Sequence, residues 1–201
     1  QLYQPNVTRG FVVDASLPPL QENHDASIQR FGDQFIATWN GAQNASFLTK
    51  HQLIRVAVST DGVSWDDSKA LHEAACDNLT DCNQWQPTMI VVTPPHSRPV
   101  LWVFWSQFQS GGIYKSPPKQ SAWFMSVLED GGTWKHRRFD GPFADTTGTQ
   151  WRLFPTQDPV QLSTGRVLVP VSMLPSAKPD TSATNSVLIT DDFGGTFKLS
   201  P

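Results

Sequence analysis

The chain has 201 residues, a formal net charge of −3 at pH 7 and no run of basic residues, which argues against nucleic acids and anionic membranes as partners. No stretch approaches the roughly 20 consecutive apolar residues that a membrane span requires. A chain of this length can bury a proper core without metals or many disulfides. The 8 Trp, 16 Pro and 13 Gly favour short strands joined by turns, and we predict no helix of ordinary length.

The first predicted unit covers residues near 24–75. A hairpin is expected over 26–39, where Gly32-Asp33 marks a tight turn, and a strand over 53–59 follows a long loop. The turn Ser59-Thr-Asp61-Gly62-Val-Ser-Trp65 comes next. In such a turn Asp accepts backbone N–H bonds, Gly takes a positive φ, and the aromatic residue packs beneath.

The same order of elements recurs near 85–140 and 156–201. Further copies of the turn end in Asp130-Gly-Gly-Thr-Trp134 and Asp192-Phe-Gly-Gly-Thr-Phe197, and the last of these matches the Asp-box pattern Ser/Thr-x-Asp-x-Gly-x-Thr-Trp/Phe directly. Equivalent strand starts fall near Ile28, Met89 and Val160, at spacings of 61 and then 71 residues. Four strands per repeat predict an all-β fold, a β-propeller of four-stranded antiparallel blades with Asp-box turns.

About three blades are expected in this chain, and three blades cannot close a ring. We therefore interpret residues 1–201 as part of a six- or seven-bladed propeller. The chain is expected to be a fragment or processed form of a longer protein, or to pair with the remaining half of the propeller.

Two cysteines, Cys76 and Cys82, lie close together, and three glycosylation sequons begin at Asn6, Asn44 and Asn78. An even cysteine count with sequons favours a disulfide and a secreted, extracellular protein, here in a mature form that starts at Gln1. Two free thiols are the alternative.

Blade connectivity decides which loops share a face. The Asp-box turns lie on one side, so Asp61, Asp130 and Asp192 are interpreted as structural. On the other side, the segments that lead into the innermost strands converge on the central axis, which makes a concave mouth the default ligand site. His24 lies at the axial end of the first inner strand and is the candidate general acid or base. A hydrogen-bonded surface histidine is the alternative, and His72 and His136 are placed in outer strands.

The expected ligand contacts at this mouth are polar, cationic or aromatic. Trp85 suits stacking on a sugar ring, with core packing as the alternative, while the cations could bind a carboxylate. No metal-ligand spacing or nucleotide motif is present, so no cofactor is expected, and a structural calcium ion is left open. The candidate contacts are Asn23, Asn40, Gln84, Trp85, Gln86, Tyr114, Lys115, Arg152, Gln157 and Asp158.

Several segments together resemble the Asp-box (BNR) sialidase-like superfamily over nearly the whole chain. They are Asn23-His24-Asp25-Ala-Ser-Ile, the turn at 59–65, Gln84-Trp-Gln-Pro-Thr88 and Pro159 to Pro170. The resemblance implies a propeller that acts on glycans. Sialidases carry an early Arg-Ile-Pro motif, and this chain has His24-Asp25-Ala26 there. Within the superfamily it is more similar to fungal seven-bladed propellers that release rhamnose from glucuronate-capped glycans by β-elimination, using a pair of His residues. The first would map to His24, whereas the region of the second holds Asn40 and Asn44.

The resemblance therefore implies a secreted carbohydrate-active propeller, with three hypotheses for its activity. The first is a lyase that cleaves a glycosidic bond next to a uronic acid in a plant or microbial polysaccharide, with His24 moving the proton. The second is an exo-glycosidase, for which Asp25 and Asp158 are the acidic candidates. The third is a non-catalytic glycan-binding module. In each case the expected partner is an acidic oligo- or polysaccharide.

Overall fold

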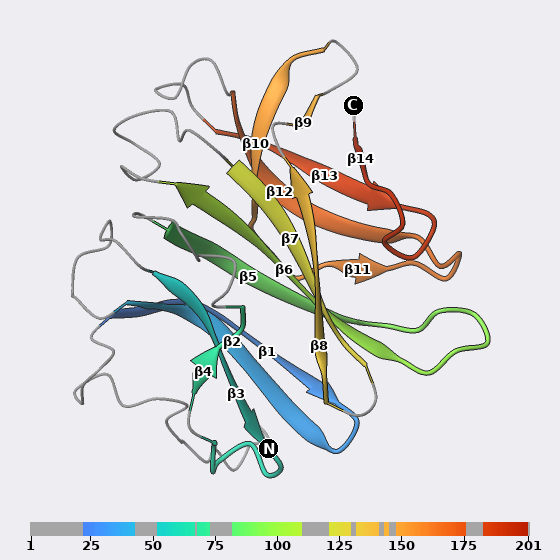
Figure 1. Cartoon of the computed structure of the whole chain (residues 1–201). Helices are drawn as coiled ribbons and strands as arrows, with labels where there is room; N and C mark the ends of the chain where they lie inside the picture. The colour runs from blue at the N-terminus through green and yellow to red at the C-terminus, as the bar shows by residue number, and fades with distance from the viewer. Residues whose placement is uncertain are drawn as a thin grey trace, which may run out of the picture.

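A computed structural model of the chain describes residues 22–42, 52–66, 68–72, 82–109, 121–129, 132–140, 143–144, 148–175 and 183–200. These residues form three antiparallel sheets that follow one another along the chain and fan out side by side (Figure 1). The prediction of an all-β fold built from antiparallel four-stranded units is confirmed. Within the described part there is no helix long and apolar enough to cross a membrane.

The first two sheets each contain four strands in chain order, so every strand pairs with its sequence neighbour. Both sheets follow the predicted sequence of short turn, long loop and Asp-box turn. The first sheet, blade 1, contains β1 (Glu22–Phe31), β2 (Gln34–Ala42), β3 (Leu53–Ser59) and β4 (Lys69–Ala70). The second sheet, blade 2, contains β5 (Cys82–Val92), β6 (Val100–Gln109), β7 (Ser121–Leu128) and β8 (Trp134–Asp140).

The third sheet, blade 3, has six strands because the strand equivalent to β1 and β5 is broken in two and a further short strand pairs with its first half. Both β10 (Gln150–Pro155) and β11 (Val160–Gln161) pair with β12 (Val167–Pro175). We predicted that this strand begins near Val160, with Arg152 before it, whereas Arg152 lies inside β10. Pro155 and Pro159 bracket the break, and proline lacks the N–H that a continuous ladder needs. The remaining strands are β9 (Phe143–Ala144), β13 (Thr184–Thr190) and β14 (Lys198–Leu199).

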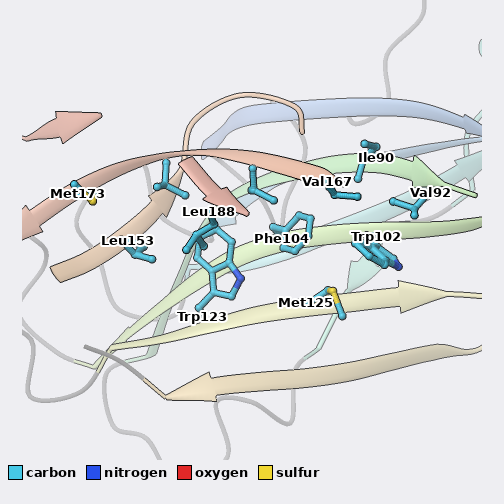
Figure 2. Packing of buried hydrophobic residues seen from close by; sticks show 12 residues of the cluster. Ile90, Val92, Trp102, Phe104, Trp123, Met125, Leu153, Val167, Met173 and Leu188 are labelled. Atoms are coloured by element: carbon cyan, nitrogen blue, oxygen red, sulfur yellow. The ribbon is translucent and has the colours of Figure 1, made fainter. Parts of the chain in front are cut away.

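Two apolar cores lie between neighbouring blades. Between blades 1 and 2, Ile36 and Ile54 pack with Trp105, whose ring stacks on Phe124 at 4.0 Å between centroids. Between blades 2 and 3, the other face of blade 2 meets the apolar face of β12 and β13, as Figure 2 shows. Each fully buried side chain of this size contributes about 1.5–3 kcal/mol. The blades are therefore joined through their faces, which places β5 next to β1 on one side and next to β10 and β11 on the other.

The Asp-box turns have the predicted hydrogen bonds where the structure describes them. Asp61 accepts from the backbone N–H groups of Ser64 (2.7 Å) and Val63 (2.8 Å), and Asp192 accepts from the N–H and hydroxyl of Thr196. These bonds favour the ionised carboxyl and lower the pKa of each aspartate to about 2. Both carboxylates therefore stabilise the turns in which they lie. Asp130 lies outside the described residues.

Candidate functional site

A pocket of about 290 Å³ opens where the inner strands of all three blades meet. From the sequence we expect the starts of these inner strands to converge on the central axis of the propeller, and the pocket lies there. Segments far apart in the sequence, one from each blade, form its wall. Its lining residues are Asp25, Ala26 and Ser27 of blade 1, Gln86, Pro87 and Thr88 of blade 2, and Pro155, Thr156, Gln157 and Asp158 of blade 3.

Matching β-bulges shape the pocket wall in blades 1 and 2. The pairing of β1 with β2 shifts register between His24 and Ser27, and that of β5 with β6 shifts between Trp85 and Thr88. At the centre of these bulges, Asp25 has φ 53° and Gln86 has φ 52°. Left-handed backbone is unfavourable for residues other than glycine and occurs mostly where surrounding structure enforces it, often at functional sites.

Asp25 and Gln86 are 61 residues apart, and Gln157 follows 71 residues later. These are the spacings of the sequence repeat, so the three residues occupy equivalent positions. All three line the pocket. In blade 3 the bulge is enlarged into the break between β10 and β11. Because a bulge re-aims the side chains around it, the repeat presents one polar side chain from each blade to the same space.

Asp158 holds the three inner strands together at the base of this arrangement. Its Oδ1 accepts a hydrogen bond from the Ser27 hydroxyl at 2.9 Å and one from the Met89 backbone N–H at 3.3 Å. The donors belong to β1 and β5, whereas Asp158 follows β10. One carboxylate oxygen therefore links three blades, and we interpret Asp158 as a brace of the pocket.

The side chains of His24 and Asp25 are hydrogen-bonded to each other beside the pocket that Asp25 lines. His24 Nδ1 lies 2.8 Å from Asp25 Oδ2, and the two side chains are 21% and 41% exposed. Asn40 Nδ2 donates to the same carboxylate oxygen at 3.0 Å and lies 3.3 Å from His24 Nδ1. An ionised carboxylate only accepts, so His24 Nδ1 carries a proton, and the basic lone pair of a neutral ring is on Nε2. A carboxylate thus orients the imidazole, whose Nε2 atom is buried within the described part of the chain.

Other predicted contacts turn out to be internal. Gln84 is fully buried and joins blades 1 and 2, because its Oε1 accepts from Ile54 N and its Nε2 donates to the carbonyl of His72. Asn23 Oδ1 accepts from the indole N–H of Trp39. Both residues support the strands that carry the site.

Trp85 is 3% exposed and belongs to a cluster with Phe108 and Phe154, whose rings stack at 4.8 Å. Its ring meets His24 edge-on at 6.2 Å. Of the two interpretations that the sequence left open for Trp85, the structure favours core packing over sugar stacking. The indole forms the apolar wall behind His24.

Arg152 is 3% exposed, and burial lowers the pKa of its guanidinium. Its Nη2 donates to the carbonyl of Pro175 at 3.3 Å, whereas Nε and Nη1 have no hydrogen-bond partner within the described ranges. Arg152 does not line the pocket. Among the described residues that do line it, the charged ones are Asp25 and Asp158, so the described wall is acidic.

Several sequence predictions fall outside the described residues. Tyr114 and Lys115 do, as do Cys76 and the sequon asparagines Asn6, Asn44 and Asn78. Cys82 begins β5, but its side chain is not described, so the disulfide stays a prediction. Within the described ranges, no group of three or more His, Cys, Asp or Glu residues could hold a metal ion.

The sequence did not single out Ser27, Thr88 or Thr156 as site residues. Each lies within two residues of a position that the repeat spacing identifies, namely Asp25, Gln86 or Gln157. A search of the two residues on either side of each repeat position would therefore have found Ser27, Thr88 and Thr156.

No family model matches the chain, and no curated protein matches it either. Among solved structures, it is similar to a Hadza microbial sialidase, with a TM-score of 0.75 and 16% identity over 94% of this chain and 39% of that one. It is also similar to the Trypanosoma rangeli sialidase, with a TM-score of 0.62 and 14% identity over 89% of this chain and 30% of that one. A third similar structure is a family 117 glycoside hydrolase of the marine bacterium Zobellia galactanivorans, with a TM-score of 0.65 and 14% identity over 96% of this chain and 59% of that one.

This chain therefore spans less than two thirds of the length of each of these structures. At such low identity the similarity establishes the fold and leaves the activity open. The three antiparallel sheets match part of a sialidase-like β-propeller.

Proposed function

We propose that the pocket between the three inner strands binds a carbohydrate, and that the His24–Asp25 pair moves a proton while a glycosidic bond is cleaved. The observation that carries this proposal is the 2.8 Å hydrogen bond between His24 and Asp25, beside a pocket that three blades build together. Solved structures with a similar fold include two sialidases and a family 117 glycoside hydrolase, which supports a glycan as the ligand.

Hydrolysis is the favoured reaction because the described wall of the pocket is acidic. Glycoside hydrolysis commonly relies on carboxyl groups, and Asp25 supplies one that is 41% exposed and that acts here by orienting His24. Asp158 is engaged by Ser27 and Met89 through one oxygen, which suits support more than proton transfer. Two carboxylates also disfavour an anionic sugar in contact with this wall, since like charges repel more strongly in a partly buried site.

In this proposal Asp25 and His24 divide the work. Asp25 holds the imidazole by its Nδ1–H and stabilises the imidazolium when Nε2 takes a proton. Gln86 and Gln157, as the equivalent residues of blades 2 and 3, offer amide groups to sugar hydroxyls from the opposite wall.

β-Elimination is the second candidate, and the same hydrogen-bonded pair is the observation that favours it. A lyase needs a base that removes the proton next to a uronate carboxylate, and a carboxylate-oriented histidine is such a base. This mechanism also needs a cation for the uronate. The described lining supplies none, and Lys115 is the sequence candidate for that role.

Product analysis separates these reactions. The purified chain is incubated with sialosides, neutral nitrophenyl glycosides and glucuronate-capped oligosaccharides, and products are read by mass spectrometry and ultraviolet absorbance. Hydrolysis adds the mass of one water, whereas elimination adds none and creates an absorbing double bond. Binding of a glycan with neither product would show a binding module and contradict the catalytic proposal.

Variants then test the assignment of the residues. His24→Ala and Asp25→Asn should each abolish turnover. His96→Asn is the matched control, because His96 is an exposed histidine in the turn between β5 and β6, and asparagine tolerates its positive φ of 58°. Full turnover by His24→Ala would remove the His24–Asp25 pair from the mechanism.

A further inference from the structure

Asn40 is fully buried in β2, yet its side chain contacts the bulge residues of two different blades, namely the carboxylate of Asp25 and the backbone N–H of Gln86. We propose that Asn40 is the positioning residue of the site: it locks these two bulges together and so fixes the orientation of the His24–Asp25 pair. Its expected effect on turnover rests on the proposed function, whereas its effect on the bulges does not.

The Asn40 side chain is the donor in one hydrogen bond and the acceptor in the other. Its Nδ2 donates to Asp25 Oδ2 at 3.0 Å, and its Oδ1 accepts from the backbone N–H of Gln86 at 3.0 Å. A carboxylate at this position would lack the donor, and an alkyl group would lack both functions. Only a side chain with a donor and an acceptor satisfies both bulges.

The two partners of Asn40 are the strained residues of the repeat. Asp25 and Gln86 have left-handed backbone at φ 53° and 52°, and such conformations persist when neighbouring groups hold them. Because one amide holds both, the spacing between Asp25 on one wall of the pocket and Gln86 on another is set by Asn40. Its Nδ2 also lies 3.3 Å from His24 Nδ1, so the whole His24–Asp25 pair is packed against it.

Complete burial excludes the role that the sequence suggested for Asn40. A side chain that is 0% exposed and engaged at both ends does not contact a bound sugar. The residue acts through Asp25 and Gln86.

The test compares Asn40→Ala and Asn40→Asp with Thr38→Val. Thr38 lies two residues earlier in β2, is equally buried, and its hydroxyl has no partner within the described ranges, so Val removes only an unused hydroxyl. In Asn40→Ala the Gln86 amide should exchange its hydrogen at least about tenfold faster, since its acceptor is gone. In Thr38→Val that exchange should stay at the wild-type rate.

Titration of the His24 ring by NMR gives a second readout. Asn40→Asp places a second carboxyl group about 3 Å from that of Asp25, where the two share one proton, so the titration of His24 should differ from that of the wild type. Asn40→Ala should lower kcat by about 10- to 100-fold, the usual loss when a supporting hydrogen bond is removed. The limb of the pH–rate profile that reports His24 should move as well.

The wild-type protein keeps the proposal testable even where a variant does not fold. The Gln86 amide should exchange more slowly than that of Gln157, its equivalent in blade 3. Equal exchange in the wild type, or unchanged Gln86 exchange and His24 titration in Asn40→Ala, would overturn the positioning role. Altered exchange and titration in a chain that turns over no glycan would uphold it and reject the proposed function.

Discussion

The imidazole rings of His72 and His136 stack on one another across the junction of blades 1 and 2, with centroids 3.9 Å apart and planes inclined by 9°. Ser126 Oγ accepts from the indole N–H of Trp105 and lies 2.9 Å from His136 Nδ1. The Ser126 hydroxyl is therefore left to donate to Nδ1, and that bond requires a neutral His136 ring. Both histidines lie in the outer part of the blades, where the sequence placed them.

The first prediction concerns acid stability. Burial, reinforced by positive charge on His72, lowers the pKa of His136 from 6.5 to about 4. As the pH falls, the unfolded chain therefore binds this proton before the folded chain does. The contribution of neutral His136 to the free energy of unfolding is complete above pH 6.5 and is lost as the pH falls from 6.5 towards 4. Its upper limit is about 3 kcal/mol, less solvent screening. Urea unfolding at several pH values should show a flatter dependence for His136→Gln than for the wild type.

His96→Asn is the control for this experiment, because His96 is exposed and lies in a distant turn. It should keep the wild-type dependence on pH. An equal slope for His136→Gln and the wild type would show that the stacked pair does not govern acid stability.

The second prediction concerns Gln84, whose side chain adds to the backbone hydrogen bond that its own N–H donates to Gln52 of the neighbouring blade. Its amide bonds to Ile54 N and to the carbonyl of His72, each at 2.9 Å, and it is fully buried. Gln84→Ala leaves both backbone groups without these partners, which should lower the free energy of unfolding by about 2–4 kcal/mol. Urea denaturation measures this loss, with the exposed Gln34→Ala as the matched control. A loss no larger than that of the control would contradict the role of Gln84.

The features that sequence could predict are those set by local chemistry. In the Asp-box turns of Asp61 and Asp192, the aspartate lies within four residues of the N–H groups whose hydrogen bonds it accepts, so the motif alone predicts these bonds. The order of strands also follows from turns and loop lengths. The break between β10 and β11 in blade 3 was not predicted, although Pro155 and Pro159 lie on either side of it.

The features that sequence could not predict depend on distances between blades. Asp158 meets Ser27 across 131 residues and Met89 across 69, and no local pattern encodes such a contact. The bulge at Gln86 adds a further obstacle, because one extra residue reverses the alternation of faces along β5. Alternation therefore could not show whether Trp85 faces the pocket or the core.

The third prediction tests Asp158 as the brace of the pocket. Asp158→Ala removes the acceptor of the Ser27 hydroxyl and the Met89 N–H, and Met89 is fully buried. The loss should be about 1–3 kcal/mol per donor left without a partner, and the Met89 amide should exchange faster. Ser27→Ala removes one bond and should cost less. An unchanged Met89 exchange rate in Asp158→Ala would show that the inner strands do not depend on this carboxylate.

The last prediction separates backbone strain from packing in the Asp-box turns. Gly194 and Gly132 have φ of 83° and 80°, so alanine is strained by about 1–2 kcal/mol at either position. A Cβ on Gly194 would lie 3.0 Å from Met125 Cε and 3.3 Å from Trp102, whereas one on Gly132 would meet nothing within 4 Å. Gly194→Ala should therefore lose a further 1–3 kcal/mol or so from overpacking, measured by urea unfolding against Gly132→Ala. Because Met125 and Trp102 belong to blade 2 and Gly194 to blade 3, an equal loss in both variants would mean that this turn does not press on the neighbouring blade.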